Sequence, residues 1–190
     1  MAMETKTPLP YEEAIEKLKK GNLAYLTALL SGGDISPARR KQTAREGQFP
    51  YAAILTCADS RVIPESIFQA GLGELFVVRV AGNVACETAI GSMEYAVRHL
   101  KVRLVLVLGH EGCGAVGAAL HGGEEGHIGT IMREIQAAIG SETRESVACR
   151  KNAERAAEKL KTALCADRDE TLKILPAVYD IETGKVEFLY

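Results

Sequence analysis

Two short segments hold residues that could carry chemistry, and each follows an apolar run. Residues 57–61 read CADSR, and residues 110–114 read HEGCG. Together Cys57, His110 and Cys113 offer two thiolates and one imidazole. That is a three-ligand set that binds zinc and leaves its fourth position open for chemistry. Because the spacing between the histidine and the second cysteine is three residues, we expect one helical turn to present both on the same side.

The cysteines also allow a simpler interpretation. Buried free cysteines commonly act as small hydrophobic residues, and Cys57 and Cys113 could do the same. A closed structural zinc site would require a fourth strong ligand. We interpret Cys86, Cys149 and Cys165 as structural, because no companion ligand lies near them in the sequence.

Asp59 and Arg61 follow the first cysteine closely enough to act at the metal's fourth position. The guanidinium can hold the carboxylate with two parallel hydrogen bonds. An ionised carboxylate only accepts hydrogen bonds, so Asp59 would favour a fourth ligand that still carries a proton, such as water, hydroxide or bicarbonate. The expected product is zinc-bound hydroxide, a nucleophile near neutral pH. The alternative is a local Asp–Arg pair that only caps a turn.

These residues depend on strands and helices that alternate along the chain. Apolar runs predict strands at 51–56, 75–80, 103–109, 172–179 and 185–189. Helical periodicity and start signals predict helices at 9–30, within 34–50, and at 64–69, 87–100, 114–120, 128–139 and 143–165.

This alternation predicts an α/β fold, with a mainly parallel central sheet flanked by helices and a C-terminal strand pair. In such sheets ligands bind beyond the carboxyl ends of the strands, where Cys57 and His110 both lie. If the two strands are neighbours, the ligands converge. We expect a single domain over residues 1–190, with an N-terminal helical arm at about 9–30.

Composition limits the partners and the compartment. The chain has 190 residues, a formal net charge of -2 and no Trp, so we expect no nucleic-acid partner. No apolar run approaches the length of about 20 residues that spans a bilayer, so we expect no membrane association. The five cysteines are an odd number without compact disulfide spacing, and the N-terminus lacks an apolar signal-peptide core. A reducing, cytoplasmic location is therefore expected.

With these residues in view, the chain resembles a beta-class carbonic anhydrase over nearly all of its length. The matching segments are CADSRV, GHEGCGAV, LFVVRVAGN at 75–83, GSMEYA at 91–96 and YDIETGKV at 179–186. The resemblance implies the beta-carbonic anhydrase fold, one Zn2+ per chain on the three ligands, and Asp59 with Arg61 as a catalytic pair. It also implies a carbonate dehydratase, a lyase that reversibly hydrates carbon dioxide to bicarbonate and a proton. The implied assembly is a homodimer built partly by the N-terminal helix, or a dimer of such dimers.

By position, the resemblance also assigns Gln48, Phe76, Tyr95 and Gly114 to the substrate pocket. Gln48 could equally be a surface residue, and Phe76 and Tyr95 could be ordinary core residues.

Three alternatives for the function and the metal site stay open. Relatives hydrolyse carbonyl sulfide or carbon disulfide with the same ligands, a zinc-binding protein could lack catalysis, and Asp59 could itself ligate zinc and close the site at low pH.

Overall fold

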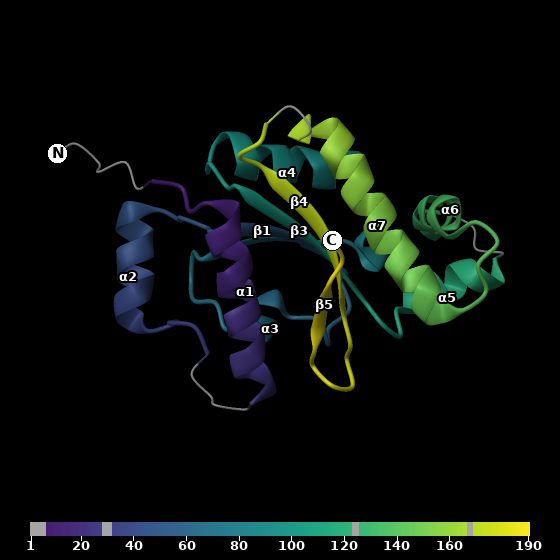
Figure 1. The fold of residues 1–190 in the computed structure, drawn as a ribbon, viewed down its shortest axis with the longest axis horizontal. Coiled ribbons are helices and arrows are strands. Elements are labelled where there is room, and N and C mark those ends of the chain that lie inside the picture. The colour runs from purple at the N-terminus through teal and green to yellow at the C-terminus, as the bar shows by residue number, and fades with distance from the viewer. Residues whose placement is uncertain (1–6, 28–31, 123–125, 167–168) are drawn as a thin grey trace.

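The computed structural model describes residues 7–27, 32–122, 126–166 and 169–190. Its centre is a five-stranded sheet with helices on both faces (Figure 1). The strands are β1 (Ala52–Thr56), β2 (Leu75–Arg79), β3 (Leu104–His110), β4 (Lys173–Tyr179) and β5 (Val186–Phe188). The helices are α1 (Tyr11–Leu26), α2 (Pro37–Glu46), α3 (Pro64–Ile67), α4 (Glu87–Arg98), α5 (Gly114–His121), α6 (Ile128–Ile139) and α7 (Glu145–Ala163), and a 3-10 turn, η1, covers Ala81–Asn83.

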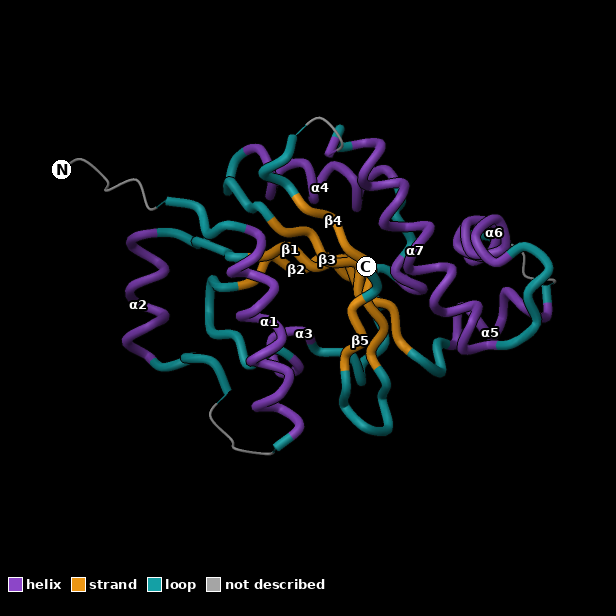
Figure 2. The backbone as a smooth tube through the Cα atoms, viewed as in Figure 1, coloured by secondary structure: helices purple, strands orange, loops and turns teal. Residues whose placement is uncertain are grey.

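The strands run in the order β2-β1-β3-β4-β5. Figure 2 shows the strands gathered at the centre with the helices around them. The first four are parallel, and β5 pairs antiparallel with β4. The predicted mainly parallel sheet with a C-terminal strand pair is therefore confirmed. Because β1 and β3 are adjacent, with Thr56 beside Leu108, their carboxyl ends meet at one edge of the sheet.

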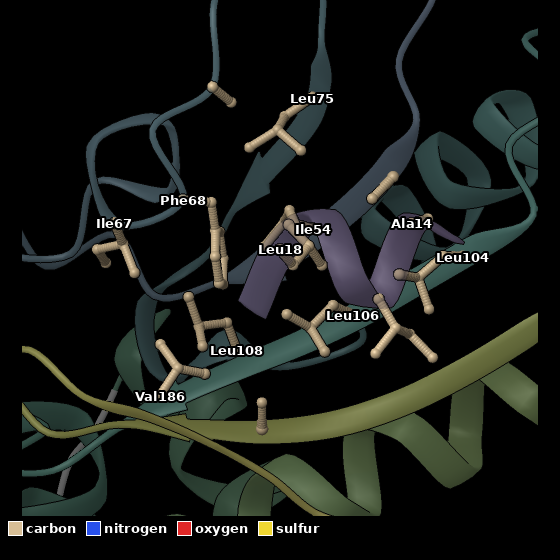
Figure 3. Packing of buried hydrophobic residues seen from close by; sticks show 14 of the residues in the cluster. Ala14, Leu18, Ile54, Ile67, Phe68, Leu75, Leu104, Leu106, Leu108 and Val186 are labelled. Atoms are coloured by element: carbon tan, nitrogen blue, oxygen red, sulfur yellow. The ribbon is translucent and has the colours of Figure 1, made fainter. Parts of the chain in front are cut away.

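The two faces of the sheet have separate cores, because successive side chains of a strand point to opposite sides. One core joins Ile54 and Leu106 to α1, where Leu18 is fully buried (Figure 3). The other joins Leu55 and Val107 to α4 and α7. A central strand covered on both sides reads as a continuous apolar run, as the Leu-Val-Leu-Val-Leu sequence of β3 does.

Helix α7 approaches the sheet closely because its inner face is lined largely by alanines. A Cβ added to Gly109 of β3 would lie 3.1 Å from the Cβ of Ala153. A third apolar cluster fills the space between α5, α6, α7 and the carboxyl edge of the sheet. This cluster includes Cys57, Cys113 and Ile135, so the two cysteines predicted as ligands pack against apolar side chains.

Most predicted elements match the structure to within a few residues, and two differences concern the candidate site. His110 is the last residue of β3, whereas the sequence placed the end of this strand at Gly109. The turn η1 was not predicted. Away from the site, helix α1 ends at Leu26 with Thr27 as its C-cap residue, and positions 28–30 of the predicted helix lie outside the described residues.

Within the described ranges, every helix is too short or too polar to cross a bilayer.

Candidate metal centre and active site

Adjacent strands bring the two sequence segments together. Cys57 directly follows β1, and His110 ends β3. The buried hydroxyl of Thr56 donates a hydrogen bond of 2.7 Å to the Leu108 carbonyl and so ties the strands just before the site. The convergence expected from neighbouring parallel strands is therefore present.

Cys57, His110 and Cys113 form a buried cluster whose ligand atoms all lie within 4.8 Å of one another. The two sulfur atoms are 3.9 Å apart. Two thiolates on a tetrahedral zinc ion, each about 2.3 Å from the metal, would lie about 3.8 Å apart. The separation therefore fits a shared zinc ion.

The imidazole of His110 is oriented for a metal as well. Its Nδ1 lies 2.9 Å from the Glu111 carbonyl oxygen, which accepts a hydrogen bond from the protonated nitrogen. Its Nε2 is buried and has no hydrogen-bond partner among the described residues. A buried nitrogen lone pair without a partner is costly unless a ligand satisfies it, and a metal ion beside the two sulfurs would do so.

The backbone between the two C-terminal ligands differs from the expected helical turn. His110 is in a strand, Gly112 has a φ of 62° and Cys113 is the N-cap residue of α5. A left-handed residue reverses the chain here, and glycine takes that conformation at little cost. The two ligands therefore face the same point from a strand end and a helix start, and the single helical turn predicted from the spacing is wrong.

The paired sulfurs ionise unequally without a metal. The Cys113 thiol hydrogen-bonds to the Cys57 sulfur and lowers the pKa of Cys57 to about 4. Burial opposes this shift, whereas contacts from His110 and from the amides of Asp59 and Gly82 lower the pKa of Cys57 further. The same sulfur contact raises the pKa of Cys113. A divalent cation would favour the thiolate form of both residues.

Asp59 and Arg61 form the bidentate pair expected from the sequence. Arg61 Nε donates to Asp59 Oδ1 at 2.9 Å, and its terminal nitrogen donates to Oδ2 at 2.6 Å. The same terminal nitrogen donates to the Gly112 carbonyl at 3.1 Å. Arg61 therefore links the loop after β1 to the loop after β3.

The Asp59 carboxylate faces the metal cluster. Its Oδ2 lies 4.0 Å from Nε2 of His110. Hydrogen bonds from the Arg61 side chain hold the pKa of Asp59 well below its usual range, although partial burial opposes this effect. The carboxylate therefore stays ionised and can only accept hydrogen bonds at near-neutral pH.

Sequence reasoning missed Arg79, the last residue of β2. Its Nε donates to the Cys57 carbonyl at 3.2 Å, and a terminal nitrogen donates to the Asp59 carbonyl at 2.6 Å. These contacts brace the backbone that carries a metal ligand and the carboxylate. A charged residue at the carboxyl end of an apolar strand was a signal that could have identified it.

Gly82 in η1 was also missed as a site residue. Its amide donates to the Cys57 sulfur at 3.3 Å. Its φ is 66°, and an added Cβ would lie 2.7 Å from Cδ1 of Ile135. The backbone conformation therefore favours glycine here, and a larger residue would also require the Ile135 side chain to shift.

The four residues assigned to the substrate pocket are not together within one chain. Gly114 begins α5 beside Cys113. Phe76 pairs with Ala53, early in β1, and its ring centroid is 6.2 Å from that of Tyr95.

Gln48 is exposed and lies just before β1. The amide of the next residue, Phe49, donates to the carbonyl of Gly73, which lies just before β2, so Gln48 is near the start of both strands. The metal cluster lies at the opposite, carboxyl end of β1. Gln48, Phe76 and Tyr95 are therefore remote from it in this chain, and their role in a pocket stays a prediction.

The remaining cysteines are free thiols outside the ligand group. Cys149 is buried on α7 beneath the metal cluster, and burial raises its pKa to about 11. Cys86 is partly buried and Cys165 is exposed.

Known proteins similar to this chain are carbonic anhydrases. The Carbonic anhydrase family model matches residues 52–186. A carbonic anhydrase of Mycolicibacterium smegmatis is 42% identical over 126 residues, which are 64% of this chain and 59% of that protein. One from Pseudomonas aeruginosa is 32% identical over 182 residues, covering 82% of this chain and 81% of that protein. The chain thus spans less than two thirds of the Mycolicibacterium relative.

The fold is similar to that of solved beta-carbonic anhydrases. One of the two tetrameric enzymes from Sordaria macrospora superimposes with a TM-score of 0.72 at 25% identity, and the match covers 94% of this chain and 95% of that one. The match extends beyond the region that carries the candidate ligands to most of the described elements.

Proposed function

The chain belongs to the beta-class carbonic anhydrase family, and on that premise we propose that it catalyses the reversible hydration of carbon dioxide to bicarbonate and a proton. The observation that carries the proposal is the buried Cys57, His110 and Cys113 cluster with the Asp59–Arg61 pair at its side. The similar proteins do not favour the hydrolysis of carbonyl sulfide or carbon disulfide that the sequence left open.

We propose that the metal is Zn2+, one per chain, held by Cys57, His110 and Cys113, which makes the enzyme a zinc-dependent lyase. Support comes from the sulfur separation of 3.9 Å and from the unpartnered Nε2 of the histidine. When bound, zinc supplies a Lewis acid that allows a water molecule to lose a proton near neutral pH. Among the residues that the structure describes, the ligand group holds these three side chains, and three protein ligands leave a fourth position on zinc for water or substrate.

Asp59 and Arg61 orient the reacting groups in this proposal. The carboxylate accepts a hydrogen bond from the oxygen nucleophile and so directs a lone pair of that oxygen toward the carbon of carbon dioxide. Arg61 keeps Asp59 ionised and fixes its plane through two hydrogen bonds. Because both carboxylate oxygens already accept from Arg61, the side chain is held as an acceptor beside the metal, which supports the open form of the site over the form closed by Asp59.

We propose that the substrate pocket is completed by a second copy of the chain. Gly114 lies next to a metal ligand, whereas Gln48, Phe76 and Tyr95 are remote from the cluster of their own chain. They could therefore line that pocket only from a partner. Tyr95 is 48% exposed, so its ring is available for such a contact.

Assembly into a homodimer, or into a dimer of such dimers, is part of the proposal. Helix α1 leaves Leu23 and Leu26 exposed by 62% and 41%, which supports a role for this arm in an interface. We further propose that residues 1–190 act as one catalytic domain in a reducing, cytoplasmic setting, where five free thiols would persist. Light scattering after size-exclusion chromatography would measure the mass of the assembly.

The test of the function is stopped-flow hydration of carbon dioxide by purified protein across a range of pH, with zinc measured on the same sample. We expect rapid hydration at about one zinc per chain. A fully zinc-loaded protein without hydration activity would contradict the proposal, and turnover of carbonyl sulfide instead would redirect it. A sharp loss of activity in acid, with zinc retained, would indicate that Asp59 closes the site.

A further inference from the structure

The sulfur of Cys57 accepts hydrogen bonds from two backbone amides. One comes from Asp59 in the same loop at 3.4 Å, and the other comes from Gly82 at 3.3 Å. Hydrogen bonds to a metal-bound thiolate reduce the charge that sulfur donates and fix its direction. The amide of Gly82 is therefore placed to influence the metal although this residue is 25 positions away in the sequence.

A side chain from a distant helix holds the turn that presents this amide. The Nδ2 atom of Asn152, on α7, donates to the Gly82 carbonyl at 2.7 Å. The N–H and C=O of Gly82 lie on either side of one Cα in the left-handed region. Fixing the carbonyl restricts ψ of Gly82 and so limits rotation of the turn that carries its N–H.

Packing alone does not explain an asparagine at this position. Asn152 is 3% exposed and lies on a helix face whose other buried residues are mainly Ala148, Ala153, Ala156 and Ala157. Burying an amide costs free energy unless it makes hydrogen bonds, and an apolar residue would fill the space without that cost. The contact with Gly82 is the specific interaction that this amide supplies.

We propose that Asn152 is a positioning residue for the metal centre, acting through Gly82 on the sulfur of Cys57. This inference rests on the proposed metal site but not on the reaction catalysed there. Without the contact, the η1 turn can rotate and the Gly82 amide leaves the sulfur. The sulfur then donates more charge to the metal but is held less firmly.

The variant Asn152→Ala tests the inference, because it removes the amide and leaves an alanine on an alanine-rich face. The matched control is Asn22→Ala. Asn22 is also buried and also donates to a glycine carbonyl, that of Gly184 at 2.9 Å, but it joins α1 to the β4–β5 turn away from the metal ligands. Both variants lose a buried asparagine, so a general loss of stability affects both.

Two properties of the metal centre would be measured. Zinc affinity is obtained by competition with a chromophoric chelator, and the Co2+-substituted protein gives the sulfur-to-metal charge-transfer band. For Asn152→Ala we expect zinc affinity to fall about 10- to 100-fold, the range found when such supporting contacts are removed. The charge-transfer band should move to longer wavelength because the sulfur electrons are less stabilised. Asn22→Ala should stay within about twofold of the parent protein, with an unshifted band, since it alters no contact of this kind.

Unchanged affinity and an unchanged band in Asn152→Ala would overturn the inference, and so would equal changes in both variants. If Asn152→Ala does not fold, the parent protein loaded with 113Cd gives an independent test. Scalar coupling between the metal and the amide proton of Gly82 is expected through the N–H···S bond, and its absence would overturn the inference. A parent protein that binds zinc but does not hydrate carbon dioxide would refute the proposed function alone, whereas one that binds no metal would refute both.

Discussion

The substitution Asp59→Asn separates the two tasks assigned to the site, which are holding the metal and orienting the nucleophile. The side chain keeps its size, and the three metal ligands are untouched. Asp59 now accepts three hydrogen bonds from Arg61, two from the guanidinium and one from the backbone amide at 2.9 Å. An asparagine keeps one acceptor oxygen and puts an NH2 group in the place of either Oδ1 or Oδ2.

The size of the expected effect follows from these contacts. If the NH2 group replaces Oδ1, the hydrogen bonds from the backbone amide and Nε of Arg61 are both lost, and the charge-assisted one alone contributes about 1.5–3 kcal/mol. If it replaces Oδ2, the hydrogen bond from the terminal nitrogen of Arg61 is lost, and a donor replaces the acceptor that the nucleophile requires. A positioned acid or base contributes roughly 10²- to 10⁴-fold, and we expect kcat/KM to fall at least about 100-fold, close to 2.7 kcal/mol in the barrier.

The assay is stopped-flow hydration with zinc measured on each sample, and Glu142→Gln is the matched control. Glu142 also accepts from the backbone amide, Nε and terminal nitrogen of an arginine two residues later, Arg144. It lies on the loop before α7, outside the metal cluster. The control should keep full activity. Nearly parental activity in zinc-loaded Asp59→Asn would refute the role of the carboxylate, and zinc loss in this variant would show that Asp59 binds the metal.

Three further predictions concern the ligands, the bracing arginine and the core. Cys57→Ser should lower the zinc content far below one per chain by elemental analysis because it removes a thiolate, whereas Cys149→Ala, outside the ligand group, should keep its zinc. Arg79→Met removes hydrogen bonds of 2.6 and 3.2 Å from the loop carbonyls. We expect stopped-flow kcat/KM to fall about 10-fold, close to 1.4 kcal/mol in the barrier, with zinc retained, because the loop that carries Asp59 is held less firmly. Unaltered kinetics would mean that the loop holds its shape without the arginine. Leu106→Ala, in the fully buried central strand, should lower the free energy of unfolding by about 2–5 kcal/mol in urea titrations, and a loss below about 1 kcal/mol would contradict the described core.

Most of the elements and the candidate ligands could be predicted from local patterns in the chain. The apolar run of β3 and the Ser36-Pro37 start of α2 are local signals, because burial on both faces and helix capping depend on neighbouring residues. Cys57 and His110 could be chosen as ligands because each follows an apolar strand, and parallel strands place such positions at one edge. The bidentate pairing of Asp59 was equally local, since its arginine is two residues away.

Tertiary structure decided what surrounds those ligands. Only the order of the strands placed β1 beside β3, and only packing of α7 brought Asn152 to Gly82, 70 positions earlier in the chain. The register of β2 against β1 likewise pairs Phe76 with Ala53, which places Phe76 away from the metal cluster of its own chain. Contacts of this kind join segments that are far apart in the sequence, and the local residue pattern of one segment does not indicate which other segment it will contact. Their geometry is fixed only when the sheet and its helices pack together, whereas strand ends and turns are fixed by the residues within them.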